Sequence, residues 1–172
     1  YADDKTSVVN IFNSYFEGNS SRWGGAIYSL NDGTSSTIVN SVFNSNTSTY
    51  AGANLGGGAI SGGNVKILNS TFSENTAYDG GAFFASNVVL SNSIFTNNTA
   101  THGGGAIYGS RLNVNNSDFI SNLAENGYGS AIYITGDTNY ISGSRFTSNN
   151  TGNGGVVYVA AGSTTVSGST FT

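Results

Sequence analysis

Residues Asn92–Tyr108 read NSIFTNNTATHGGGAIY and contain two phrases, N-S-x-F-x-x-N and G-G-A-I-Y, joined by a short polar connector. Both phrases recur from one end of the chain to the other. The phenylalanine of the first phrase occurs seven times, at intervals of 23 to 29 residues: Phe16, Phe43, Phe72, Phe95, Phe119, Phe146 and Phe171. The second phrase or a close variant occurs six times, at 24–28, 57–61, 80–84, 104–108, 129–133 and 154–158. A period near 25 residues, seen this often, is typical of a solenoid of stacked coils.

The phased residues predict three short strands in each coil. An aliphatic residue stands five positions before every phenylalanine, and mostly apolar or β-branched residues stand two positions earlier. This spacing of two indicates a strand with one buried face. An Asn-Ser or Gly-Ser pair follows, and we expect it to bend the chain into a second strand that carries the phenylalanine.

The GGAIY phrase is the third predicted strand. Its fourth position is always large and apolar, so we place it inside, with the preceding alanine and the following aromatic residue outside. The reverse orientation, with alanine and tyrosine inside, stays open. The paired glycines predict a tight corner with positive φ.

These features predict an all-β fold, a right-handed, single-stranded parallel β-helix of about six to seven coils, each of roughly 23–29 residues and three strands. Residues 1–172 then form one domain, as a segment of a longer repeat protein or as a filament subunit. Coil length varies at the corners, and residues 47–56 are the longest insertion, which we expect to be a surface loop.

The phenylalanine column is the predicted core, because identical rings one coil apart can stack. An asparagine three residues after the phenylalanine is the predicted polar ladder, since stacked amides can hydrogen-bond from coil to coil. This column contains Asn19, Asn46, Asn75, Asn98, Asn122 and Asn149.

Charge and composition exclude several classes of protein. The chain has 5 Lys and Arg residues, 9 Asp and Glu residues and a formal net charge of −4, so we expect no nucleic-acid partner. No apolar run approaches the roughly 20 residues of a spanning helix, so we expect no membrane insertion. The chain contains no cysteine, and its carboxylates do not repeat as a calcium loop would, so no metal or cofactor is predicted.

The phased F-x-x-N and G-G-A-[I/L/V] phrases resemble the repeats of chlamydial polymorphic outer-membrane proteins. They are also similar to those of adhesin-like proteins of methanogenic archaea, as in NSTFSENTAYDGGAFF at 69–84. The resemblance covers essentially the whole chain. It implies a right-handed parallel β-helix at the cell surface with an adhesive or structural role. A complete autotransporter would add an outer-membrane barrel, so the resemblance implies that this chain is a passenger fragment or an independently exported protein.

Three groups of residues are candidate binding or modification sites. If the aromatic column of the GGAIY strands faces outward, it suits stacking on sugar rings or packing against a neighbouring rod; it contains Tyr28, Phe84, Tyr108, Tyr133 and Tyr158. Strand-favouring aromatics that stack only on each other are the alternative. The insertion offers Thr49, Tyr50 and Asn54 as a binding loop. Asn97 and Asn115 are the candidate glycosylation sites among the N-x-[ST] sequons.

Catalytic groups are sparse. The nine carboxylates fall on different coils and columns, and only Asp79 and His102, about one coil apart at similar corners, form a suggestive pair. We therefore predict no catalytic residues and no enzymatic activity, with a polysaccharide-active β-helix enzyme as the least favoured alternative.

The predicted function is that of an extracellular, adhesin-like rod whose partner is a host or neighbour-cell glycan or protein. The alternative is a structural subunit that stacks head-to-tail on itself into an extracellular filament. It follows from a sequence that begins part-way through a coil and ends within another, without a predicted capping helix.

Overall fold

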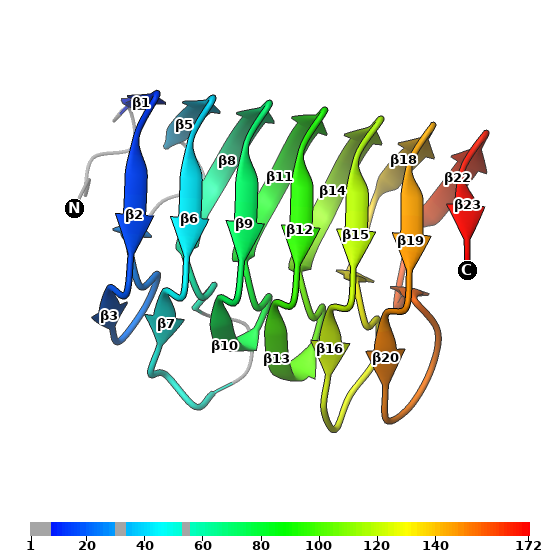
Figure 1. Ribbon diagram of the computed structural model, residues 1–172. Helices are drawn as coiled ribbons and strands as arrows, with labels where there is room; N and C mark the ends of the chain where they lie inside the picture. The colour runs from blue at the N-terminus through cyan, green and yellow to red at the C-terminus, as the bar shows by residue number, and fades with distance from the viewer. Residues whose placement is uncertain (1–7, 30–33, 53–55) are drawn as a thin grey trace.

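The computed structural model describes residues 8–29, 34–52 and 56–172, and all regular secondary structure in these residues is β-strand. Successive coils stack side by side from the N-terminus to the C-terminus (Figure 1), and every strand pairing is parallel. This arrangement confirms the predicted parallel β-solenoid of about six to seven coils.

Three sheets run along the solenoid. The first has ten strands: β1 (Val8–Phe12), β4 (Ile27–Tyr28), β5 (Ser35–Val39), β8 (Ile60–Leu68), β11 (Phe83–Ser91), β14 (Ile107–Asn115), β17 (Ile132–Ile134), β18 (Thr138–Ser142), β21 (Val157–Val159) and β22 (Ser163–Ser167). The second has seven: β2 (Tyr15–Glu17), β6 (Val42–Asn44), β9 (Thr71–Ser73), β12 (Ile94–Thr96), β15 (Asp118–Ile120), β19 (Arg145–Thr147) and β23 (Thr170–Phe171). The third has six: β3 (Ser20–Ser21), β7 (Thr47–Ser48), β10 (Thr76–Asp79), β13 (Thr99–Gly103), β16 (Leu123–Ala124) and β20 (Asn150–Thr151).

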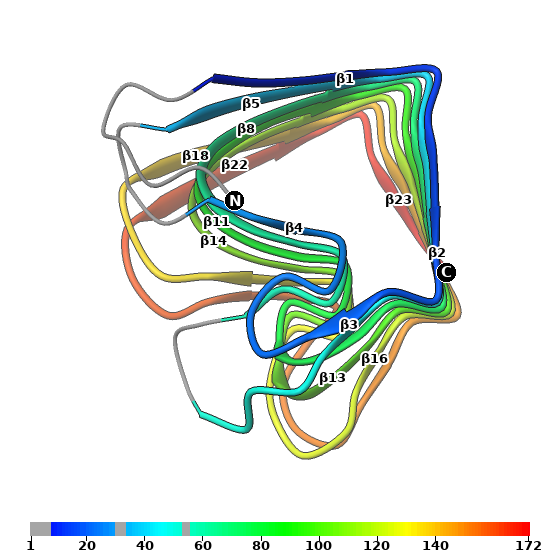
Figure 2. The same cartoon turned by 90° about the vertical axis from the view of Figure 1, so that its left-hand side faces the viewer.

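The strands divide among the three sheets differently from the expectation. The GGAIY strand and the strand before the Asn-Ser corner both belong to the first sheet, and in β8, β11 and β14 they are one continuous strand of nine residues. Figure 2 shows this sheet folding back on itself, with β4 on one limb and β1 and β5 on the other. The third sheet instead follows the asparagine ladder. Its short strands have no hydrophobic period in the sequence, which is why periodicity did not reveal them.

The phenylalanine column forms the centre of the core, as predicted. Phe43, Phe72, Phe95 and Phe119 are fully buried, and consecutive rings in this group lie 4.9 to 5.0 Å apart and nearly parallel. In the outermost described coils Phe16 is half-buried and Phe171 is 45% exposed. Ring stacking therefore continues through every coil, whereas full burial needs a coil on both sides.

Two polar ladders run beside this core. The Nδ2 atom of Asn98 donates to Asn122 Oδ1 at 3.0 Å and to the Phe72 carbonyl at 3.0 Å, and the pattern repeats along the asparagine column. A serine ladder lies at the Asn-Ser corner, where the sequence also favours a ladder: the Ser93 amide donates to Ser117 Oγ at 3.2 Å. Both ladders satisfy corner backbone groups that would otherwise be buried without partners.

The corners use left-handed backbone. Five asparagines of the Asn-Ser pairs have φ between 46° and 51°, as expected. A second left-handed position precedes the asparagine ladder and is occupied by Ser45, Glu74, Asn97, Ser121 and Ser148. This second corner was not predicted, because its polar residues vary in type among serine, glutamate and asparagine.

In the GGAIY phrase the structure confirms the predicted orientation of the large apolar residue and corrects that of the alanine. Its large apolar residues are buried, as at Ile60, Phe83 and Ile107. The expectation that the alanines point outward is wrong, since Ala82 and Ala106 are fully buried and belong to the core. The reason is that alanine lies in the glycine corner and not in the strand: the amides of Ala82 and Phe83 both donate to the Ala106 carbonyl. The alternation of inward-facing and outward-facing side chains therefore begins at the residue after the alanine.

The insertion at 47–56 begins inside strand β7, so only its later part forms a loop. Thr49 and Tyr50 are described, whereas Asn54 lies outside the described residues. Thr49 Oγ1 donates to the Ser21 carbonyl at 3.1 Å, which ties the start of the loop to the preceding coil.

Candidate functional site

The aromatic column lies outside the core but is largely covered. Tyr28, Phe84, Tyr133 and Tyr158 are half-buried, and Tyr108 is only 6% exposed. The column stacks on itself, with ring centroids 5.1 Å apart for Phe84 and Tyr108 and 4.6 Å apart for Tyr108 and Tyr133. Self-stacking was the alternative considered for these residues, and it describes the geometry of the middle coils.

The third sheet provides the cover. In Figure 2 the limb that contains β4 lies between the limb of β1 and β5 and the third sheet. Strand β13 contacts the column directly: a Cβ atom at Gly103 would lie 2.8 Å from the Tyr133 ring, and the rings of His102 and Tyr133 are 6.3 Å apart. The column is therefore a filled seam between two sheets in the middle coils.

Asp79 and His102 meet in this seam, as the sequence suggested. His102 Nδ1 and Asp79 Oδ1 are 2.7 Å apart; the carboxylate is fully buried, whereas the imidazole side chain is 37% exposed. Asp79 pairs with Gly103 across a bulge that inserts one extra residue into β13. This bulge places His102 over the Tyr78 ring, at a centroid distance of 5.4 Å.

Burial and charge perturb two tyrosines of the seam. Burial raises the pKa of Tyr108 above its ordinary value, and the negative charge of Asp79 adds to the shift. The pKa of Tyr133 is raised chiefly by burial, with smaller contributions from Tyr158, Asp79 and Tyr128. The raised pKa values favour the neutral form of both phenols.

A second aromatic cluster surrounds the start of the insertion. Trp23 lies 5.1 Å from Tyr28 and 6.4 Å from Tyr50 by ring centroids. The Arg22 guanidinium lies over the Trp23 and Tyr50 rings, at 5.0 and 5.6 Å. Tyr50 is thus half-buried in a packed cluster, and Thr49 is exposed beside it.

The two candidate glycosylation sites differ in accessibility. Asn97 is exposed at the second left-handed corner, with φ of 54°. Asn115 is half-buried, and its Nδ2 atom donates to Asn113 Oδ1 at 2.8 Å. Asn97 is therefore the more accessible acceptor, and glycosylation stays a prediction.

A groove on the outer face of the first sheet was not found from the sequence. Three adjacent cavities of about 430, 250 and 380 Å³ open over β8, β11, β14 and β18. Asn87 lines all three, and Arg111 lines two of them, so the cavities form one continuous groove across the strands. We call this surface the outer groove. It is lined by Ser35, Asn64, Val65, Lys66, Ser86, Asn87, Val88, Val89, Ser110, Arg111, Leu112, Asn113, Asp137, Thr138 and Tyr140.

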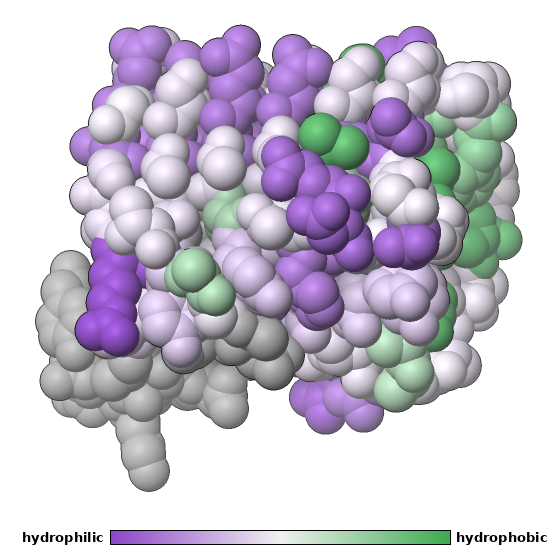
Figure 3. Space-filling model, turned by 90° about the horizontal axis from the view of Figure 1, so that it is seen from below, coloured by the Kyte–Doolittle hydropathy of each residue, from purple (hydrophilic) through white to green (hydrophobic). Residues whose placement is uncertain are grey.

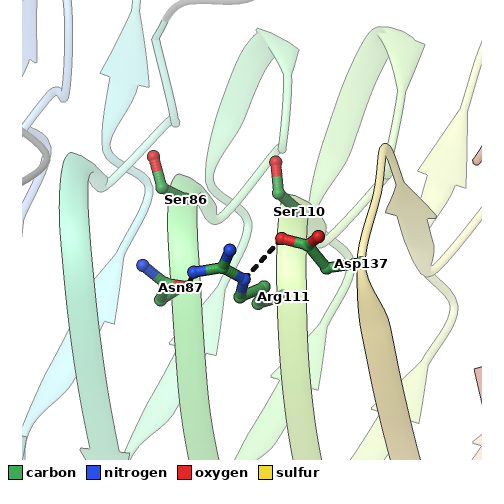
Figure 4. Close-up of a pocket in the computed structure, with 5 residues that line it drawn as sticks. All are labelled: Ser86, Asn87, Ser110, Arg111 and Asp137. Atoms are coloured by element: carbon green, nitrogen blue, oxygen red, sulfur yellow. Dashed lines mark hydrogen bonds and ion pairs between the residues drawn. The ribbon is translucent and has the colours of Figure 1, made fainter. Parts of the chain in front are cut away.

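A chain of polar side chains forms one wall of the outer groove. Asn64 Nδ2 donates to the Thr34 carbonyl at 3.2 Å, and Asn87 Nδ2 donates to Asn64 Oδ1 at 2.5 Å. Figure 4 shows the Arg111 side chain between Asn87 and Asp137. Arg111 forms an ion pair with Asp137 and donates to Asn87 Oδ1 at 3.5 Å. The wall thus continues from coil to coil, one side chain in each.

The other wall is more apolar. Strand register aligns Lys66, Val89, Asn113 and Tyr140 on adjacent strands, and all four are exposed. Tyr140 is 51% exposed and Val89 is 46% exposed. The sequence signal for this groove was an outward column whose residue type varies along the chain, and a search for repeated residues passes over such a column.

The opposite side of the molecule is less distinctive. Seen from the side of the third sheet (Figure 3), most of the surface is hydrophilic or neutral, and hydrophobic residues gather toward the C-terminal end. In the described part of the chain, no helix has the length and apolar character needed to cross a membrane. No group of three or more His, Cys, Asp or Glu residues that could hold a metal ion occurs among the described residues.

Comparison with known proteins agrees with this architecture. The family model described as "Right handed beta helix region" matches residues 3–171. No curated protein and no solved structure matches the chain. The match spans nearly the whole sequence and covers every coil of the solenoid described above. The chain therefore belongs to the right-handed β-helix family.

Proposed function

We propose that this chain is a non-enzymatic, extracellular attachment protein of the adhesin-like type, a β-helical rod that binds a glycan through its side. The observation that carries the proposal is the outer groove, an open surface that combines amides, an Arg–Asp pair and an exposed tyrosine. Binding sites for sugars and other polar small molecules combine apolar contact with a few placed polar groups.

The rigidity of the rod supports this function. The asparagine, serine and phenylalanine ladders join neighbouring coils through buried contacts. A groove built on such a scaffold loses little conformational entropy when a ligand binds, so that even shallow contacts can contribute affinity.

The distribution of acids also supports a binding role. Asp137 is the only carboxylate among the residues that line the outer groove, and it forms an ion pair with Arg111. Most glycoside hydrolases instead place two carboxyl groups on either side of the bond that they cleave. The fully buried Asp79 has no surface from which to contact a substrate.

The proposal is tested by incubating the purified chain with an array of immobilised glycans and with intact cells. We expect saturable binding to a subset of the glycans and no change in their chain length. Absence of binding to every glycan and cell surface would overturn the attachment function.

A second candidate function is cleavage of a polysaccharide, and the observation that favours it is the Asp79–His102 pair. A buried carboxylate that fixes one imidazole nitrogen orients the other, as in catalytic acid–base pairs. Release of new reducing or unsaturated ends from a panel of polysaccharides, abolished by His102→Asn, would establish this function in place of the first.

A further inference from the structure

We infer that the outer groove binds an extended, uncharged oligosaccharide that runs along the rod axis, across the strands, with Arg111, Asp137 and Tyr140 as its principal contacts. This inference rests on the proposed function and adds the place, the direction and the chemical class of the ligand. Four features of the groove carry it.

The first feature is direction. The groove extends from Ser35 on β5 to Thr138 on β18 and crosses β8, β11 and β14 between them. Five adjacent strands at a spacing of about 4.8 Å give a length of roughly 19 Å along the rod axis. The groove walls therefore repeat once for each coil, and a ligand that follows the groove meets a new set of side chains about every 4.8 Å.

The second feature is the match between this repeat and the ligand. A sugar unit of an extended β-linked glycan is comparable in length to the strand spacing, so that successive units lie over successive coils. An extended peptide advances only about 3.3 Å per residue and loses this register. A peptide also gains most of its affinity at a sheet edge, whereas the groove lies over a sheet face whose backbone groups pair between β8, β11 and β14.

The third feature is the polar chemistry of the wall from Asn64 to Asp137. Arg111 presents donors only and Asp137 presents acceptors, while the amides of Asn64 and Asn87 present both. A hydroxyl group can donate to one and accept from another, so neighbouring sugar hydroxyls satisfy this mixed wall. An anionic group only accepts hydrogen bonds and is repelled by Asp137, whose charge also neutralises Arg111. Lys66 is then the one lining cation outside this ion pair, and it lies in the cavity at the other end of the groove, which neither Arg111 nor Asp137 lines.

The fourth feature is the apolar wall. Tyr140 and Val89 expose large apolar surfaces toward the same cavity that Arg111 lines from the other side. The ring face of a tyrosine packs well against the C–H face of a sugar ring, and the packing needs no charge on the ligand. The polar wall then contacts the hydroxyl edge of the same unit.

The test uses β-linked neutral hexose oligosaccharides from disaccharide to hexasaccharide, with a matched series of uronic-acid oligosaccharides, in isothermal titration calorimetry. Affinity for the neutral series should rise up to about four units and then level off, because the groove spans about four strand spacings. The binding should be nearly independent of salt concentration, since no net charge is paired.

Two groove variants and two matched controls locate the site. Arg111→Ala and Tyr140→Ala should each weaken binding about tenfold or more. Arg145→Ala breaks an Arg–Asp ion pair with Asp118 on the second sheet, and Tyr15→Ala removes a tyrosine there that is more exposed than Tyr140. Both controls should bind as the unchanged chain does. Circular dichroism and thermal melting establish that all four variants fold.

The outcomes separate the inference from the function on which it rests. Glycan binding that survives both groove variants would overturn the outer groove as the site while leaving the attachment function intact. Stronger binding of the uronic-acid series, weakened by salt, would overturn the uncharged ligand class. Loss of all glycan and cell binding in the unchanged chain would overturn the proposed function itself.

Discussion

His102 Nδ1 lies 2.7 Å from Oδ1 of Asp79, and the two residues come from adjacent coils, on β13 and β10. The imidazole reaches solvent while the carboxylate does not. A buried carboxylate is costly unless it is paired and hydrogen-bonded, so His102 stabilises the covered seam around Tyr108 and Tyr133.

His102→Ala removes one hydrogen-bond partner of this buried carboxylate, and we expect the free energy of unfolding to fall by roughly 1–3 kcal/mol. The control is Arg145→Ala, which breaks the exposed ion pair with Asp118 and should cost less than about 1 kcal/mol. Urea unfolding at neutral pH measures both. Equal losses in the two variants would show that burial of Asp79 has no energetic consequence.

The raised pKa values of Tyr108 and Tyr133 predict a loss of stability at alkaline pH. Below about pH 10 both phenols are protonated in the folded and the unfolded chain, so their contribution is complete. Above about pH 10 the two phenols lose their protons in the unfolded chain before they do so in the folded chain. The free energy of unfolding therefore falls as pH rises. Urea titrations between about pH 8 and pH 11 measure this slope. Tyr108→Phe should make the fall of the unfolding free energy with pH shallower. An unchanged slope would contradict the raised pKa of Tyr108.

The asparagine ladder predicts a large difference between two neighbouring residues. Asn98→Ala deletes a side chain that makes four hydrogen bonds, to Phe72, to Asn122 and twice to Asn75, and we expect a loss of about 3–5 kcal/mol. Asn97→Gly is the control, because Asn97 is exposed with positive φ and glycine accepts that backbone; its effect should stay within about 0.5 kcal/mol. Thermal unfolding compares them, and a similar loss in both would argue against the ladder.

Gly105 tests the close approach of neighbouring coils. A Cβ atom there would lie 2.0 Å from the Ser130 carbonyl oxygen, so Gly105→Ala should destabilise the chain by about 3 kcal/mol or more. At Gly136 a Cβ atom meets nothing within 4 Å, and Gly136→Ala should change stability by no more than about 1 kcal/mol. Urea unfolding, or the soluble yield if Gly105→Ala does not fold, distinguishes the two. A tolerated alanine at Gly105 would mean that the coils can separate locally.

The stacked core predicts the cost of a cavity. Phe95 lies between Phe72 and Phe119 at centroid distances of 5.0 and 4.9 Å, and Phe95→Ala should lower the free energy of unfolding by about 3–5 kcal/mol. Ile94→Ala alters the exposed neighbour on the same strand and should cost less than about 1 kcal/mol. Chemical denaturation measures the loss in both variants. A small difference between them would mean that the neighbouring rings collapse into the space left by Phe95.

Much of the solenoid was predictable because its interior repeats. Phe95 sits on Phe72, and Asn98 on Asn122, because in-register parallel strands bring equal positions of neighbouring coils together. The same register made the Asp79–His102 pair visible from spacing alone. Extracellular location, filament assembly and the absence of enzymatic activity stay predictions.

The sequence by itself determined the coil length, the buried phenylalanine column and the asparagine ladder, since each needs one residue type at one phase. The tertiary structure decided what covers the aromatic column, why Ala82 is buried, and where a groove opens beside Arg111 and Tyr140. These features depend on how the first sheet bends and where the third sheet lies. The bend within the first sheet and the path of the third sheet involve residues that vary from coil to coil, so only the packed chain reveals them.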